Sequence, residues 1–227
     1  MERDLTQGKI GKSILLFSIP MILGNLLQQF YNIVDTYIVG QYIGSNALAA
    51  VGSSYTLMTF LTSIIIGLCM GSGILFSMYF GAKKYEKMKI SFFVSFVSIG
   101  ILSIILEVIC FLLLKYILVW LQIPQVIYNQ TAKYLQIIFI GIIFTFIYNY
   151  FAAMLRALGN SKIPLIFLGI ATIVNVVLDI VFVLYVHLGV AGAAYATIIS
   201  QAISAFGLAL YVLLLKKEIL PQKTLCF

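Results

Sequence analysis

Charged residues are scarce in this sequence. Asp, Glu, Lys and Arg make up 9% of the 227 residues, whereas soluble domains carry about 25%. Apolar residues account for 63% of the chain, and the mean hydropathy is +1.11. This deficit of charge excludes an ordinary soluble domain and indicates an integral membrane protein.

The residues that most enzymes need are also missing. The chain has one histidine, which excludes most catalytic triads, and it contains no Gly-rich phosphate loop, zinc-binding helix motif or nucleophile elbow. Its three cysteines, Cys69, Cys110 and Cys226, lack metal-ligand spacing and are expected to act as packing residues. We therefore expect no enzymatic activity and no cofactor.

Six apolar runs are long enough to cross a bilayer, which takes about 20 residues each. The sequence thus predicts an all-α integral membrane fold of six transmembrane helices, between a polar N-terminus at 1–12 and a basic tail at 216–227. No cleavage pattern follows the N-terminus, so the first run is expected to be retained. The runs cover about 13–39, 46–80, 90–120, 126–158, 162–187 and 189–215.

Two of these runs carry small residues at helical spacing, which let helices approach closely. The series are Ser63, Gly67 and Gly71 in the second run, and Gly192, Ala196, Ser200 and Ser204 in the sixth.

The net charge of +7 does not indicate a nucleic-acid partner, because the basic residues lie in short clusters between apolar runs. Alternating spans place 12 of the 14 Lys and Arg on one side of the membrane, and only Lys115 and Lys133 on the other. Cytoplasmic loops carry the excess of basic residues. We therefore expect a multi-pass protein of the plasma (inner) membrane with both termini in the cytoplasm.

Three acidic residues, Asp35, Glu107 and Asp179, lie deep in apolar runs. An ionised side chain at the bilayer centre costs about 2.5–3.5 kcal/mol on the most lenient scale, so each needs an explanation. Glu107 has no polar stripe of its own, and we expect a structural or interfacial role for it.

The other two acids belong to polar stripes. Asp35 shares a helical face with Gln28 and Asn32, and Asp179 follows Asn175 by four residues on a common face. These stripes are expected to face protein or water rather than lipid.

Other runs offer further oxygen groups, including Thr197 and Tyr134, and also Tyr148 and Asn149. Carboxylate, amide and hydroxyl oxygens are suited to a proton or to a hard cation such as Na⁺. Two interpretations stay open on the residues alone: the acids bind a coupling ion, or they hold helices together through hydrogen bonds. Pro20, inside the first run, is expected to kink that helix or let it bend.

Three segments closely resemble the multidrug and toxic compound extrusion (MATE) family of cation-coupled efflux transporters. They are IPMILGNLLQQFYNIVDTYIVGQYIGSNALAAVG, RALGNSKIP and NVVLDIVFVLYVHLGVAGAAYAT. The resemblance implies a fold of twelve helices in two six-helix lobes around a central cleft, of which this chain is similar to the N-terminal lobe.

The resemblance also implies site residues. The family's N-lobe cation site is matched here by Asp35, Asn175, Asp179, Thr197 and Tyr134, and its bending proline by Pro20. It implies H⁺ or Na⁺ as coupling ion and small organic cations as substrates. Gln28, Asn32, Tyr148 and Asn149 are the expected residues of the substrate cleft.

The length of the chain leaves several possibilities for its assembly. A fragment, a truncated or split gene product and a half-transporter that pairs with a C-terminal lobe or a second copy in a homodimer are all compatible with 227 residues. Two alternative functions are a lipid-linked precursor flippase of the wider superfamily, disfavoured because the apolar runs supply no basic cleft, and a non-transporting membrane fragment.

Overall fold

The computed structural model describes residues 10–215, with side chains at 11, 15 and 17–214. The predicted N-terminus, up to residue 9, and the predicted basic tail at 216–227 lie outside the described residues, as does Cys226. The described part is helical and contains no strand. Its elements are α1 (Ile10–Tyr42), α2 (Ser45–Gly81), α3 (Tyr85–Trp120), α4 (Gln125–Ile140), α5 (Ile142–Ala157), α6 (Lys162–Asp179), the π-helix η1 (Ile180–Tyr185) and α7 (Val190–Leu215).

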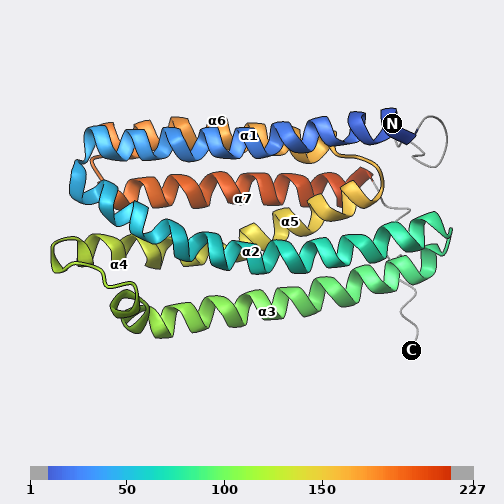
Figure 1. Ribbon diagram of the computed structural model, residues 1–227, viewed down its shortest axis with the longest axis horizontal. Coiled ribbons are helices and arrows are strands. Elements are labelled where there is room, and N and C mark those ends of the chain that lie inside the picture. The colour runs from blue at the N-terminus through green and yellow to red at the C-terminus, as the bar shows by residue number, and fades with distance from the viewer. Residues whose placement is uncertain (1–9, 216–227) are drawn as a thin grey trace.

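The helices form an elongated up-and-down bundle, in which α1 runs beside α6 and the hairpin of α2 and α3 forms the opposite edge (Figure 1). Between these edges, α7 packs against α6, α5 and α4, and α2 packs against α5, α3 and α4. The apolar runs thus assemble into one helical bundle.

Three helices end in the same way. The second residue after the end of the helix adopts a left-handed conformation, at Lys83 (φ 56°), Gln122 (φ 52°) and Gly159 (φ 79°). The next amide nitrogen then bonds back to a carbonyl in the last turn, as from Lys84 to Tyr79 at 2.9 Å. This arrangement is the Schellman motif, which satisfies otherwise unpaired carbonyls and turns the chain sharply.

The predicted fourth helix is not continuous. It breaks at Gly141 into α4 and α5, which are bent by 42° relative to each other. A Cβ atom on Gly141 would lie 3.0 Å from the Ile138 carbonyl oxygen and 3.1 Å from Gln201 Oε1 of α7. The bend and the close approach of α7 therefore depend on glycine at this position.

The predicted fifth helix also departs from a regular α-helix. After Asp179 the chain continues as η1, a π-helix that ends at Tyr185 rather than at 187. Gly192 of α7 packs directly on it, since a Cβ there would lie 3.1 Å from the backbone C and O of Phe182. Single-turn π-helices are rare and occur frequently at functional sites.

Four segments are long and apolar enough to cross a membrane, namely α2, α3, α6 continued through η1, and α7. The bent pair of α4 and α5 adds a fifth if it is one span. Over the part of the chain that the structure describes, α1 is not one of the segments that are long and apolar enough. The chain is therefore a multi-pass helical membrane protein, and the count of six spans stays a prediction.

The larger apolar core joins α2, α3 and α5 around aromatic side chains. The buried Tyr150 hydroxyl donates to the Phe92 carbonyl at 2.5 Å and lies 2.7 Å from Ser95 Oγ. Cys69 and Cys110 are buried and free, in agreement with a packing role. Six rings contribute to the cluster: Phe76, Phe92, Phe96, Phe146, Tyr150 and Phe151.

The two predicted small-residue faces have different outcomes. All four residues on α7 are buried against neighbouring helices, as expected. Ser63, Gly67 and Gly71 on α2 are exposed, and a Cβ on either glycine would have no neighbour within 4 Å. The α2 series is therefore not a contact within this chain, contrary to the prediction.

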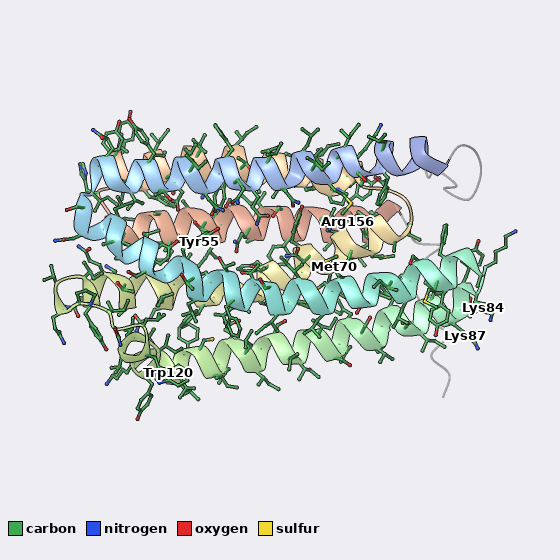
Figure 2. The ribbon with its side chains drawn as sticks, viewed as in Figure 1. Tyr55, Met70, Lys84, Lys87, Trp120 and Arg156 are labelled. Carbon is green, nitrogen blue, oxygen red and sulfur yellow. The ribbon has the colours of Figure 1, made fainter. Side chains whose placement is uncertain are left out.

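The two ends of the bundle differ in charge. We call the end that carries the α2–α3 and α5–α6 turns the basic end, because Lys83, Lys84, Lys87, Arg156 and Lys162 lie at or beside these turns. Figure 2 shows Lys84, Lys87 and Arg156 toward this end and Trp120 toward the other. The asymmetry of the described basic residues matches the predicted one.

Candidate functional site

The fold brings the two stripe acids together. Asp35 lies in the second half of α1, and Asp179 is the last residue of α6, the helix that packs against α1. The exposed fraction is 7% for Asp35 and 0% for Asp179. The packing of α1 on α6 brings the two carboxyl groups close enough to interact electrostatically, although 144 positions separate them in the sequence.

This acid pair lacks donors. Both carboxyl oxygens of Asp179 and Oδ1 of Asp35 are buried without a hydrogen-bond partner among the described residues. The side-chain oxygen and nitrogen of Asn175, one turn before Asp179, are also buried without a partner. Buried polar atoms are normally paired, because an unpaired group costs about 1–3 kcal/mol. Such a concentration of unpaired oxygens is what a bound proton or cation would satisfy.

A hydroxyl pair adjoins the acids. Tyr31 of α1 donates to Thr197 Oγ1 of α7 at 3.1 Å, and Thr197 donates to the Ala193 carbonyl at 3.0 Å. A threonine oxygen has one proton and two lone pairs. The Thr197 oxygen therefore retains one lone pair that neither contact uses.

The fifth predicted residue, Tyr134, enters from α4. It is 7% exposed and lies near both Asp35 and Asp179. The structure thus brings together all five residues predicted for the cation site, from α1, α4, α6 and α7. The groups available to hold an ion are carboxyl and hydroxyl oxygens and one side-chain amide. Residues 10–215 contain no cluster of three or more His, Cys, Asp or Glu that could hold a metal ion.

An apolar cluster lies between the acid pair and the end opposite the basic end. Ile38 and Val39 follow Asp35 along α1, Val183 follows Asp179, and Val190 precedes Thr197, and all four are buried in one cluster. Because the helices alternate in direction, each of these residues lies on the same side of the acids (Figure 1). Packed apolar side chains therefore lie between the acid pair and that end of the bundle.

The predicted cleft residues do not gather at the acids. Gln28 is exposed on α1, and Asn32 is half-buried, with its amide 3.2 Å from Gln29 Oε1. Tyr148 donates to the Pro164 carbonyl at 3.0 Å, and Pro164 precedes Asp179 by 15 residues, or about 22 Å of helix. Asn149 donates to the Thr145 carbonyl in its own helix at 2.8 Å.

Pro20 is buried inside α1, which is helical on both sides of it. The proline removes one main-chain donor from the ladder. Its role as a hinge stays a prediction.

Sequence reasoning missed two features of this region. Tyr31 is one of 14 tyrosines, and its position four residues before Asp35 was the available signal. Its contact with Thr197 places it at the site. Gln130, one turn before Tyr134 on α4, has a buried Oε1 without a partner. Its position four residues before a predicted site residue is the signal that was available.

The MatE family model matches residues 20–181, which include both acids of the pair. The chain belongs to the MATE family. It is 37% identical over 218 residues to the probable multidrug resistance protein YpnP of Bacillus subtilis (strain 168), covering 96% of this chain and 48% of the relative. It is 30% identical over 207 residues to the multidrug export protein MepA of Staphylococcus haemolyticus (strain JCSC1435), covering 90% and 45%.

The fold agrees with this assignment. A solved structure of a MATE protein in the bent conformation superposes with a TM-score of 0.89 at 23% identity, over 97% of this chain and 49% of that one. This MATE chain spans about half the length of the curated relatives it matches. The predicted family and fold class are confirmed, and the relatives are named as multidrug proteins rather than as enzymes.

Proposed function

We propose that this MATE chain is one lobe of a cation-coupled antiporter that exports small organic cations in exchange for H⁺ or Na⁺. The observation that carries the proposal is the buried pair of Asp35 and Asp179, whose oxygens lack donors. An intramembrane acid is a functional-site hypothesis by default, and here two acids meet in one place. The names of the multidrug relatives support the substrate class.

The coupling ion would occupy the space between the carboxyl groups. A single proton joins two carboxyls by a hydrogen bond in which one donates to the other. Na⁺ would instead take oxygen ligands from Asp35, Asp179, Asn175 and Thr197, with Tyr134 alongside. Either ion removes the repulsion of two buried carboxylates, which is strong where the local dielectric is low.

Occupancy of the site would control α1. This helix carries Asp35 and Tyr31, while their partners lie on α6 and α7. An ion between the acids holds α1 against the bundle, and its release weakens that hold. Pro20, which lacks the main-chain donor, is the position at which α1 would bend. The exposed polar face of α1 at Gln28 and Asn32 would line the path of the organic cation, with Tyr148 and Asn149 nearer the basic end.

The complete transporter would need a second lobe. A C-terminal six-helix lobe or a second copy of this chain would supply the other wall of the cleft, around an axis along the membrane normal. The exposed glycines of α2 offer one face for close contact. We place the assembly in the plasma membrane with the basic end in the cytoplasm.

A lipid-linked precursor flippase is less well supported. A pyrophosphate group needs cationic partners inside the cleft. Among the described residues no Lys or Arg is buried, and only Lys89 and Arg156 are half-buried.

Ethidium efflux from everted membrane vesicles tests the proposal, with the chain expressed alone and together with a C-terminal MATE lobe. An imposed H⁺ or Na⁺ gradient should drive efflux, and Asp35→Asn or Asp179→Asn should reduce the gradient-dependent rate at least tenfold. Glu107→Gln is the matched control, because Glu107 is an intramembrane acid outside the pair. Efflux that persists unchanged in Asp35→Asn would refute coupling at this site, and no efflux in either arm would assign the chain to a non-transporting subunit.

A further inference from the structure

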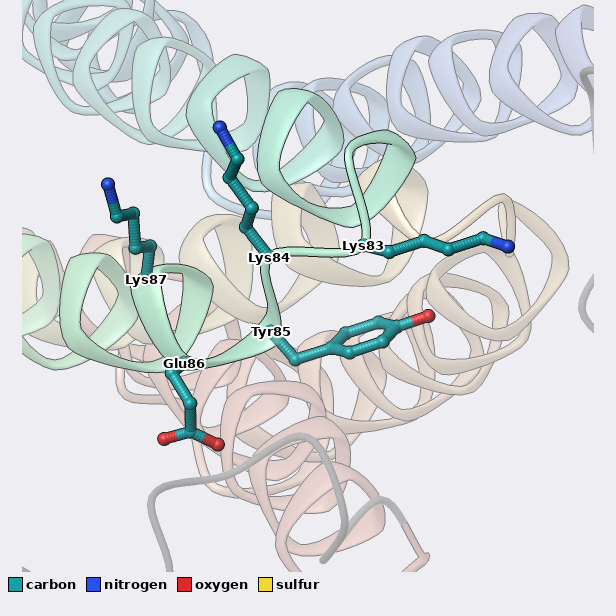
Figure 3. Close-up of a pocket in the computed structure, with 5 residues that line it drawn as sticks. All are labelled: Lys83, Lys84, Tyr85, Glu86 and Lys87. Atoms are coloured by element: carbon teal, nitrogen blue, oxygen red, sulfur yellow. The ribbon is translucent and has the colours of Figure 1, made fainter.

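The α2–α3 turn at the basic end forms a second polar feature, far from the acid pair. Its residues line an open pocket of about 360 Å³ (Figure 3). Figure 3 shows Lys84 and Lys87 pointing to one side of the turn, Lys83 and Tyr85 to another, and Glu86 away from the lysines. The turn therefore presents two ammonium groups on one side and a third on another.

These positive charges are not balanced within the described residues. The ion pair of Lys89 with Glu86, at 3.0 Å, is the only one among the side chains that the structure describes. It uses the one acidic group of the turn and leaves Lys83, Lys84 and Lys87 for an external anion. Exposed ammonium groups on both sides of one turn favour phosphate groups, whose oxygens accept charge-assisted hydrogen bonds.

Lys83 adopts a backbone conformation that glycine prefers. This residue has φ 56°, at the position after a helix where glycine is usual. A non-glycine residue there costs on the order of 1 kcal/mol. A Lys83→Gly variant therefore removes the ammonium group without adding backbone strain.

The location of the turn identifies the source of the anion. The two helices that it joins are both apolar enough to span a membrane, and α3 has 36 residues, or about 54 Å of helix against a bilayer of about 40–45 Å with its headgroups. The ends of α3 therefore reach the headgroup layers. Exposed aromatic residues, Tyr85 at one end and Trp120 at the other, are typical of these layers.

We propose that the α2–α3 turn binds the head group of an anionic phospholipid in the leaflet at the basic end. Lys83, Lys84 and Lys87 contact the phosphate and neighbouring acidic lipids, and Tyr85 packs at the boundary between headgroups and acyl chains. Each lysine near an anionic surface contributes roughly 1 kcal/mol, a factor of about five in affinity.

Quenching by brominated lipids tests this site directly, because the chain has a single tryptophan, at the opposite end. The full chain carrying Tyr85→Trp and Trp120→Phe is reconstituted with brominated phosphatidylglycerol or brominated phosphatidylcholine. We expect the anionic lipid to quench the introduced tryptophan at a several-fold lower mole fraction than the zwitterionic lipid. The preference should weaken in 0.5 M NaCl.

Two variants and one competitor separate the explanations. Lys83→Gly with Lys84→Gln and Lys87→Gln should abolish the preference at the turn, while Lys83→Gly alone should weaken it without lowering the Tm. Trp120 in the parent chain is the matched reporter and should show no preference. Equal quenching by both lipids at the turn overturns the proposal, and so does a preference that 10 mM inorganic phosphate removes, which would assign the turn to a soluble anion.

Discussion

At the scale of single residues, the proposed function depends on polar side chains that are costly to place in the hydrocarbon core of a bilayer. Asp35 and Asp179 are buried, their oxygens lack donors, and they meet across two helices. A structural acid would be expected to bond to donors such as the Asn175 amide, yet that amide is also unpaired. The arrangement therefore fits a cation-binding site better than a fixed hydrogen-bond network.

These acids could be predicted from the sequence because a carboxylate in an apolar run is rare. The same reasoning singled out Asn175, which lies on the same helical face as Asp179, and the polar residues Thr197 and Tyr134 of other apolar runs. It did not single out Tyr31, which lies four residues before Asp35, because 32 aromatic residues occur in the chain and most of them pack against lipid or core. Only the contact of Tyr31 with Thr197 separates it from the rest.

Tyr31→Phe tests the hydroxyl contact between α1 and α7. The change removes one part-buried hydrogen bond, which contributes about 1 kcal/mol, and should lower the free energy of unfolding by that amount. The measurement is thermal unfolding of the purified chain. Tyr37→Phe is the matched control on the same helix, because Tyr37 is 65% exposed, and it should change stability by less than about 0.5 kcal/mol. Equal losses in the two variants would contradict the assignment.

At the scale of helices, hydropathy predicted where the apolar segments lie but not where they break. The run from 126 to 158 is apolar through Gly141, and glycine is common in membrane helices. The 42° bend occurs where Gln201 of α7 comes close to that glycine, a long-range contact that local sequence does not encode. The π-helix after Asp179 likewise has no compositional signature.

The direction of helix faces is equally hard to predict in a membrane. In water a small-residue stripe that is also apolar would be buried, but lipid-facing and core-facing residues are both apolar in a bilayer. The Gly67 and Gly71 series therefore faces outward on α2, whereas the Ala196 and Ser200 series is buried on α7.

Gly192→Ala tests the contact between α7 and the π-helix. The new methyl group would lie 3.1 Å from the Phe182 backbone, which cannot move as a side chain can, so we expect a loss of about 1–3 kcal/mol. Thermal unfolding again provides the measurement.

The control for this variant is Gly67→Ala, at a glycine with no neighbour within 4 Å. Alanine is the better helix former by about 0.8–1 kcal/mol in water, so the control should be neutral or stabilising. If Gly192→Ala is as stable as Gly67→Ala, the backbone of η1 can shift to admit the methyl group without loss of stability, which would contradict the prediction.

At the scale of the whole molecule, charge gives the bundle two distinct ends. The described lysines and arginine at the α2–α3 and α5–α6 turns face one side, and Trp120 lies at the other. This asymmetry was predictable because loop charge, unlike helix packing, is read directly from the sequence.

Cysteine labelling in intact cells tests the orientation. With Cys226 replaced by serine, an impermeant maleimide should leave Lys84→Cys unlabelled in intact cells and label it after permeabilisation. Gln122→Cys, in the turn between α3 and α4, should be labelled in both conditions. The reverse pattern would place the basic end outside the cytoplasm and refute the proposed topology.

The most direct measurement of the central claim is the cation dependence of Tm for the purified full chain. A ligand that binds only the folded state at 100 times its Kd adds about 2.7 kcal/mol, or roughly 5 °C for a chain of this size. We predict that Na⁺ at pH 8, or acidification without Na⁺, raises the Tm of the wild type and of Glu107→Gln by several degrees. Asp35→Asn, Asp179→Asn and the double variant should all lose this shift to the same extent, because one ion needs both acids. A shift that survives in either single variant would contradict the account.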